Sequence, residues 1–219
     1  MPMKLHPTHK SLRVFLAAEL SSDLRQKVVE LQRQLRDTLP EVNWVLPESI
    51  HLTLKFLGYV DAAMVEKLLP ALEPVGSIQA SLTLAIQGLG VFPHIRRPRI
   101  LWIGCAGAIP SLVKLVSRIE GALEPLGFPL EKKPYHPHLT LARIKHDNSK
   151  VGGVLTHSGL LEQPQALGIL RIDRITLFRS DVSSFGAEYT SLGTVPMIQA
   201  DSRSSTEDRH LPVRGGGVR

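Results

Sequence analysis

The tetrapeptide His-Leu-Thr-Leu occurs twice in the chain, at residues 51–54 and at residues 138–141. Side chains of residues i and i+2 point to the same face of a β-strand. Each copy therefore places a histidine and a threonine on one face and two leucines on the other. Two such strands lining a cleft would supply two imidazoles and two hydroxyls around one small anionic group. This set of groups suits paired general-acid and general-base catalysis on a phosphodiester.

The segments around the two copies also match each other. A short apolar strand precedes each copy, and the separation from Arg13 to His51 equals that from Ile100 to His138. Between strand and motif, each half carries apolar residues at the i, i+4, i+7, i+11 spacing of one helix face, namely Leu24, Val28, Leu31 and Leu35, then Leu112, Val116, Ile119 and Leu123. The pattern predicts an internal duplication with pseudo-twofold symmetry. Two units are too few for a solenoid, so we expect one bilobed body.

The element pattern predicts an α+β fold with a pseudo-twofold duplicated, bilobed architecture and helices on the outside. Strands are expected near residues 12–19, 43–45, 50–57, 80–86, 99–105, 138–144, 169–179 and 187–195, and helices near 22–37, after Asp61 and near 109–126. Residues 1–11 are predicted to be a flexible leader, and residues 12–198 a single domain whose halves begin near 12 and near 99. Residues 199–219 are polar without periodic apolar positions, which predicts a disordered tail.

Composition places the chain among globular proteins. Of its 219 residues, 43% are hydrophobic and 21% charged, and no apolar run approaches the roughly 18–20 residues that span a bilayer. The N-terminus lacks the apolar segment of a signal peptide, and the single cysteine, Cys105, excludes an internal disulfide. We therefore expect a cytoplasmic protein with no membrane contact. The net charge of +6 has the right sign for phosphate ligands, although an ordinary solvated surface explains it equally well.

A lone histidine in a strand is usually structural or on the surface. The repeated His/Thr pair is harder to explain by packing, because leucine fills a core better and a buried histidine needs its own partners. The competing interpretation is a zinc site, which usually needs three or four ligands at short spacings. Cys105 is alone and no His-x3-His pattern exists, so we expect no metal. His136, two residues before His138, is interpreted as a structural or supporting group.

The motif threonines and a trailing arginine are candidate phosphate ligands. Thr53 and Thr140 are either simple β-formers or hydroxyl donors to a phosphate oxygen, and their fixed offset from the histidines favours the second interpretation. By strand alternation Lys55 shares the face of its histidine. Arg143 does not, unless the strand twists or bulges before it.

A basic loop supplies two further substrate-binding candidates. Arg97 lies in a run of arginines that would track an RNA backbone, and a solvated loop is an equal alternative. Phe92 near that loop would stack on a base, although a core position is the more common fate of a phenylalanine.

The longer stretches that contain these motifs resemble the two-histidine (2H) phosphoesterase superfamily and, within it, the RNA 2′,3′-cyclic phosphodiesterases also called 2′-5′ RNA ligases. The resemblance runs from residue 12 to residue 196. It rests on residues 13–17, 43–45, 51–58, 90–93, 97–99, 101–102, 135–143, 177–180 and 187–190. The leader and the tail lie outside it.

The resemblance implies a metal-independent hydrolase with no cofactor and two antiparallel sheets flanking a central groove. It implies that His51 is the proton donor, that His138 is the proton acceptor, and that Thr53 and Thr140 hold the non-bridging phosphate oxygens. The implied reaction opens a terminal 2′,3′-cyclic phosphate of RNA to a 2′-phosphomonoester. A weak ligase activity would be the reverse of similar chemistry. We expect RNA ends as partners, no obligate protein partner, and a monomer.

Two other classes of function stay open at this point. A related enzyme would act on small cyclic nucleotides or on 2′-5′ oligonucleotides. A non-catalytic RNA-binding module would keep the groove without turnover, but both histidines and both threonines are intact, which argues against it. Turnover measurements on the three substrate classes separate these possibilities.

Overall fold

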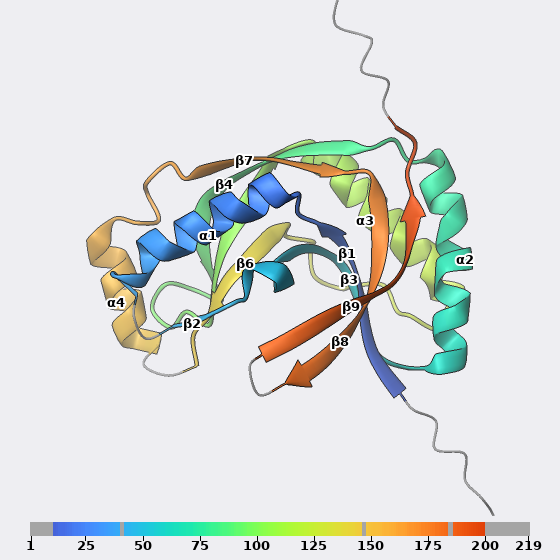
Figure 1. Ribbon diagram of the computed structural model, residues 1–219, viewed down its shortest axis with the longest axis horizontal. Helices are drawn as coiled ribbons and strands as arrows, with labels where there is room; N and C mark the ends of the chain where they lie inside the picture. The colour runs from blue at the N-terminus through green and yellow to red at the C-terminus, as the bar shows by residue number, and fades with distance from the viewer. Residues whose placement is uncertain (1–10, 40–41, 146–147, 184–185, 200–219) are drawn as a thin grey trace, which may run out of the picture.

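The computed structural model describes residues 11–39, 42–145, 148–183 and 186–199 (Figure 1). Its elements, in chain order, are β1 (Ser11–Glu19), α1 (Ser22–Arg36), β2 (Asn43–Trp44), the short 3-10 helix η1 (Pro47–Ser49), β3 (His51–Asp61), α2 (Ala62–Ile78), β4 (Leu82–Phe92), β5 (Ile100–Gly107), α3 (Ile109–Leu123), the 3-10 helix η2 (Glu124–Leu126), β6 (His138–Arg143), α4 (Asn148–Ser158), β7 (Ala166–Ile172), β8 (Arg174–Ser183) and β9 (Gly186–Pro196). No helix in these ranges is both long and apolar enough to cross a membrane.

Across the described ranges, nine strands form one curled antiparallel sheet in the order β7-β4-β5-β6-β3-β1-β8-β9, with β2 added on β6 (Figure 1). The sheet has two lobes, because the central strands β3 and β6 pair at one register position only, Leu52 opposite Leu139. Both leucines are the second residue of a His-Leu-Thr-Leu motif, so the two repeats meet at matching positions. The predicted α+β fold with a duplicated, bilobed arrangement is confirmed. The two expected sheets are joined at this one pair.

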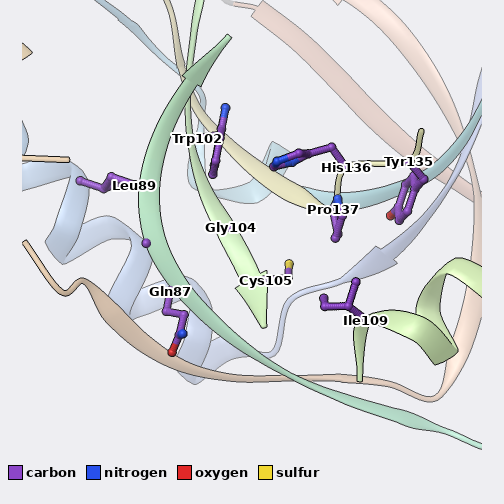
Figure 2. A pocket seen from close by; sticks show the side chains of 10 residues that line it. Gln87, Leu89, Trp102, Gly104, Cys105, Ile109, Tyr135, His136 and Pro137 are labelled. Atoms are coloured by element: carbon purple, nitrogen blue, oxygen red, sulfur yellow. The ribbon is translucent and has the colours of Figure 1, made fainter. Parts of the chain in front are cut away.

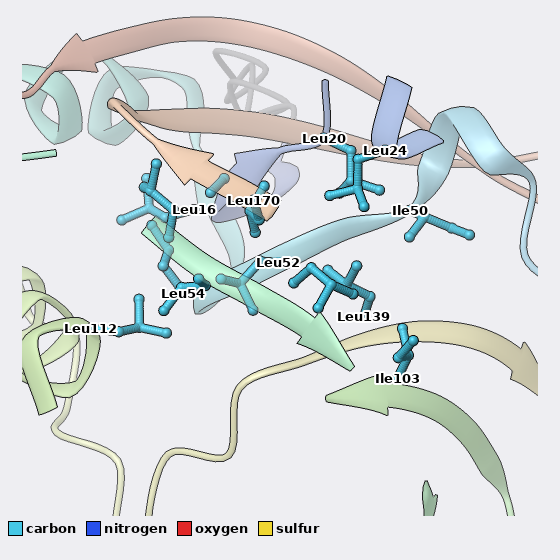
Figure 3. Close-up of a cluster of buried hydrophobic side chains, with 14 of the residues drawn as sticks. Leu16, Leu20, Leu24, Ile50, Leu52, Leu54, Ile103, Leu112, Leu139 and Leu170 are labelled. Carbon is cyan, nitrogen blue, oxygen red and sulfur yellow. The ribbon is translucent and has the colours of Figure 1, made fainter. Parts of the chain in front are cut away.

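The apolar stripes predicted for the two repeated helices face the core. The side chain of Ser21 caps α1 by accepting a hydrogen bond from the backbone N–H of Leu24 at 3.3 Å. The stripe residues are buried, namely Leu24, Val28, Leu31 and Leu35 in α1 and Leu112, Val116, Ile119 and Leu123 in α3. They pack with the motif leucines Leu52, Leu54 and Leu139 in one continuous cluster (Figure 3). Burial of this apolar surface leaves the histidines and threonines on the opposite face of the motif strands.

Each repeated helix also makes polar contacts with the motif strand of the other half. Gln32 of α1 is buried, and its amide donates to the carbonyl of Leu141 in β6 at 3.0 Å. Lys55 of β3 forms an ion pair of 3.0 Å with Glu120 of α3. The two halves are therefore interlocked rather than simply placed side by side.

The structure divides one expected strand in two and describes little of the expected leader and tail. The strand expected over residues 169–179 is wrong as a single element, because the chain breaks at Asp173 into β7 and β8, which join opposite lobes. The predicted leader and tail lie outside the described residues except for Ser11, which begins β1, and Gln199, which accepts a hydrogen bond from Arg171 at 2.6 Å. The proposed domain boundaries stay a prediction.

Candidate active site

The two motif histidines begin the two central strands of the sheet. In β3 and in β6, the first four residues alternate between half-buried His and Thr and fully buried Leu. Because Leu52 pairs directly with Leu139, the two His/Thr faces lie beside each other at the junction of the lobes. The alternation that the sequence predicted therefore brings both imidazoles and both hydroxyls to one place.

Both imidazole rings are held in the same way. The Nδ1 atom of His51 lies 2.8 Å from the carbonyl oxygen of Ser49, and Nδ1 of His138 lies 2.7 Å from the carbonyl oxygen of His136. A carbonyl oxygen only accepts hydrogen bonds, so Nδ1 carries the proton in each ring. The other nitrogen, Nε2, is then a free base in the neutral ring and a donor in the protonated ring. Each histidine is thus oriented to exchange a proton through Nε2.

A β-bulge follows the threonine in each motif strand. Leu54 of β3 and Leu141 of β6 are both skipped in the pairing with the neighbouring strand. An extra residue of this kind reverses the alternation of faces along the strand. As a result Lys55 is buried on the far face with Glu120, and the expectation that it shares the face of His51 is wrong.

The same bulge in β6 brings Arg143 to the site. Simple alternation would turn this side chain away from His138, but with Leu141 skipped it returns to the histidine face. Its positive charge lowers the pKa of His138 and of His51, so its guanidinium lies within electrostatic range of both rings. Arg143 is exposed, and it is therefore available to an anion bound between the histidines.

Aromatic side chains surround each histidine. The ring centroid of His51 lies 4.6 Å from Phe15 and 5.1 Å from Tyr189. The ring of His138 lies 5.0 Å from Phe92 and 6.2 Å from Trp102. The structure therefore brings the predicted candidate Phe92 to the site.

Sequence reasoning missed Phe15, Trp102 and Tyr189 as site residues. Phe15 precedes His51 by the same number of residues as Trp102 precedes His138. An alignment of the two halves would therefore have placed Phe15 opposite Trp102, each at the same spacing from a motif histidine. Tyr189 carries no such signal, because it lies far along the chain and reaches His51 only through the pairing of β9 with β8.

The remaining candidates differ in their positions. Thr53 and Thr140 are half-buried on the histidine face, and within the described ranges neither hydroxyl has a hydrogen-bond partner. Both hydroxyls are therefore free to donate to a phosphate oxygen. Arg97 is exposed in the turn between β4 and β5, and its role in substrate binding stays a prediction. Among the residues that the structure places, no three His, Cys, Asp or Glu side chains gather as a metal site would require.

Burial lowers the pKa of both histidines. Loss of solvent is the main cause for His51, whose pKa falls to about 4, and the positive charges of Arg143 and His138 act in the same direction. The pKa of His138 is also lowered, mainly by burial and further by the charges of His136 and Arg143. In the free enzyme both rings are therefore neutral at neutral pH.

These shifts predict an acidic optimum for kcat/KM. Paired acid–base catalysis needs one protonated and one neutral histidine, and in the free enzyme that form is most abundant between the two lowered pKa values, below the ordinary value of 6.5. As the pH rises above the higher pKa, the remaining imidazolium loses its proton, so kcat/KM should fall by about tenfold per pH unit. The optimum for kcat should lie at higher pH, because a bound phosphate anion favours the charged ring. Steady-state kinetics across the pH range measure both profiles, and a kcat/KM that rises steadily above 6.5 would contradict this interpretation.

Comparison with known proteins identifies the family. Residues 19–102 and residues 103–185 each match the family described as LigT like Phosphoesterase. The match is itself duplicated, and its second copy begins close to the start predicted for the second half. Because the two matches together cover more than half of the sequence, the chain belongs to the LigT-like phosphoesterase family. The resemblance inferred from the motifs is confirmed.

Individual relatives extend over most of the chain. A protein of Aquifex aeolicus named RNA 2′,3′-cyclic phosphodiesterase is 29% identical over 185 residues, which cover 83% of this chain and 95% of the relative. A protein of Methanocaldococcus jannaschii with the same name is 34% identical over 140 residues, which cover 64% of this chain and 76% of the relative.

Solved structures share the fold. The crystal structure of the Thermus thermophilus protein TT0787 has a TM-score of 0.72 at 25% identity and covers 86% of this chain and 99% of its own. E. coli LigT complexed with 3′-AMP has a TM-score of 0.71 at 22% identity, with coverage of 87% of this chain and 100% of its own. At that identity the likeness to LigT concerns the fold alone.

Proposed function

We propose that this chain hydrolyses a 2′,3′-cyclic phosphodiester at the end of an RNA to a 2′-phosphomonoester. The observation that carries the proposal is the pair of matching imidazoles, each fixed through Nδ1 by a backbone carbonyl and each offering Nε2 to one site. The names of relatives that span most of the chain support the same reaction class.

In this mechanism His138 is the base and His51 is the acid. Nε2 of His138 takes a proton from the attacking water, whose oxygen forms a bond to phosphorus. The bond from phosphorus to the 3′ oxygen breaks, and Nε2 of His51 protonates that oxygen. The roles follow the family pattern, and the low pKa of His51 adds a condition to them. The negative charge of the substrate has to raise this pKa for His51 to hold its proton.

The other polar groups stabilise charge on phosphate. The free hydroxyls of Thr53 and Thr140 flank the histidines and donate to the non-bridging oxygens as negative charge develops there. Arg143 supplies a fixed positive charge at the same position. Preorganised donors of this kind act strongly because the half-buried site excludes part of the water.

A substrate panel tests the proposal. The purified protein is given an RNA oligonucleotide that ends in a 2′,3′-cyclic phosphate, the four nucleoside 2′,3′-cyclic phosphates, and 2′-5′ linked oligonucleotides. The proposal predicts the highest kcat/KM on the RNA end, with a 2′-phosphate as product, which phosphorus NMR distinguishes from a 3′-phosphate. Exclusive turnover of the mononucleotides would favour a small cyclic nucleotide as the substrate. Binding without turnover of any of them would favour the RNA-binding module.

Chelation separates acid–base catalysis from metal catalysis. All the catalytic groups proposed here are side chains of the protein, so we expect dialysis against EDTA to leave kcat on a cyclic-phosphate RNA unchanged within error. Loss of activity that one added divalent metal restores would revive the zinc-site interpretation.

A further inference from the structure

One polar side chain lies among the buried apolar residues of α1. Gln32 is only 2% exposed and shares the buried side of the helix with Val28, Leu31 and Leu35. Its amide nitrogen donates two hydrogen bonds, to the carbonyl of Val45 at 2.8 Å and to the carbonyl of Leu141 at 3.0 Å. A leucine would fill this position more favourably, because a buried amide is costly unless its hydrogen bonds are made. The role of Gln32 therefore lies at these two carbonyls.

The carbonyl of Leu141 belongs to the bulge in β6. Before this residue the pairing with β5 is regular, with Gly104 opposite His138 and Trp102 opposite Thr140. Figure 2 shows the two β5 residues at the cavity that they line together with the segment leading into β6. Leu141 is then skipped, and the pairing resumes after it. The bulge therefore begins directly after the motif threonine.

Gln32 holds the skipped residue from the side of α1. The Leu141 carbonyl also accepts from the backbone N–H of Val45 at 2.9 Å, so the three residues form a closed set of three hydrogen bonds. A return to regular pairing would draw this carbonyl away from both donors. Arg143 follows His138 by an odd number of residues, so the two share a face only while one residue between them is skipped. The hydrogen bonds at Leu141 thus bear directly on the position of Arg143.

The other half of the protein holds its own bulge in a similar way. Glu120 occupies in α3 the position that Gln32 occupies in α1, one residue after the third apolar residue of the stripe. Its carboxylate accepts a hydrogen bond of 3.0 Å from Lys55, which directly follows the skipped Leu54 of β3. In both halves a polar residue at one position of the repeated helix therefore holds the bulge of the opposite motif strand. This recurrence indicates a shared role in fixing the strand next to the motif.

We propose that Gln32 is a positioning residue, whose amide holds the bulge at Leu141 and so keeps the guanidinium of Arg143 on the face of the two motif histidines. The inference rests on the proposed function where it concerns rate, but its effect on the histidines needs no substrate. The positive charges that lower the two pKa values are those of Arg143 and His138 for His51, and those of His136 and Arg143 for His138. If Arg143 turns away, both pKa values rise.

The test replaces Gln32 by methionine in the full chain, which removes both hydrogen bonds but keeps the length of the side chain. NMR titration of the imidazole protons should show the pKa values of His51 and His138 raised, as in Arg143→Ala. At the pH optimum of each protein, kcat/KM on adenosine 2′,3′-cyclic phosphate should fall by about 10- to 100-fold, the usual cost of misplacing a group from a distance.

A second buried glutamine supplies the matched control. Gln79 follows α2, is 7% exposed, and donates its amide to the carbonyl of Ala80 at 3.0 Å. Gln79→Met should lower the melting temperature but leave the histidine pKa values and kcat/KM at those of the wild type. A loss of stability alone therefore does not imitate the expected result.

A double variant separates positioning from a general structural effect. In the Arg143→Ala background, Gln32→Met should lower kcat/KM by less than about twofold more, because the group that it positions is already absent. Equal fold losses in both backgrounds, or unchanged histidine pKa values in folded Gln32→Met, would overturn the inference.

Two further provisions keep the test decisive. Gln32→Asn, whose shorter side chain cannot reach both carbonyls, is held to the same criteria should Gln32→Met not fold. Wild-type protein that does not turn over the cyclic phosphate would refute the proposed function alone, since the titration decides the positioning role without substrate.

Discussion

Replacing either His51 or His138 by alanine should lower kcat/KM on a 2′,3′-cyclic phosphate by about 10²–10⁴-fold, the usual contribution of a positioned acid or base. Each ring offers Nε2 to the site and is held through Nδ1 by the carbonyl two residues earlier. Because these rings lie on the half-buried face and not in the leucine core, both variants should remain folded. Steady-state kinetics and thermal melts measure the two effects.

A matched control and a second substrate make this experiment specific. His157 on α4 is exposed and makes a comparable Nδ1 contact with the carbonyl of Gly153 at 2.7 Å, so His157→Ala should keep wild-type kinetics. Bis(p-nitrophenyl) phosphate has a leaving group that needs no acid. His51→Ala should therefore lose far less activity on it than His138→Ala does. Equal losses on this substrate would contradict the assigned roles, and near wild-type activity of either variant on the cyclic phosphate would contradict the paired mechanism.

Replacing Arg143 by alanine should lower kcat/KM by about 10²–10³-fold, as expected when a group that stabilises developing charge on oxygen is removed. The substitution also removes a positive charge that lowers the pKa of both histidines. The pH optimum of kcat/KM should therefore move to higher pH, which a purely structural role would not cause. Arg143→Lys keeps the positive charge but replaces the planar guanidinium by an ammonium group. The loss in kcat/KM should therefore be intermediate, and the pH optimum should stay close to that of the wild type.

The control for Arg143 is a substitution of the same kind elsewhere. Arg33 on α1 is exposed and pairs with Glu30 on the same helix at 2.7 Å, so Arg33→Ala should change neither the rate nor the pH optimum. An Arg143→Ala variant with wild-type kcat/KM would show that the threonines and histidines bind the phosphate without it.

Much of the site was predictable because it depends on local alternation within a repeated motif. The facing of His51 and His138, the burial of their leucine neighbours and the helix stripes all follow from periods of two and 3.6 residues. The bulges at Leu54 and Leu141 break the period of two, and no local signal marks them. For that reason the positions of Lys55 and Arg143 could not be fixed from the sequence.

Long-range pairing accounts for the other differences. The chain breaks at Asp173, and β7 and β8 then lie in opposite lobes. β7 pairs with β4 and β8 pairs with β1, and both partner strands lie far away in the sequence. The aromatic group around His51 depends on the same long-range pairing. Tyr189, which contacts His51, lies on β9, and β9 pairs with β8. Neither assignment can be made from a window of neighbouring residues.

The two bulged strands also differ in a way that concerns the 5′-to-3′ direction in which an RNA substrate would bind. The two halves of the site are near copies, and a perfectly twofold site would accept a phosphodiester in either direction, with half of all binding events unproductive. Phe56 and Arg143 occupy the same position in the two halves. Each follows the bulge of its strand and lies at the same sequence distance from its motif histidine. Phe56 is 60% exposed and its ring lies 6.0 Å from that of Phe15, so the matching position is apolar in one half and cationic in the other. We expect this difference at one position of the repeat to set the direction in which a substrate strand binds.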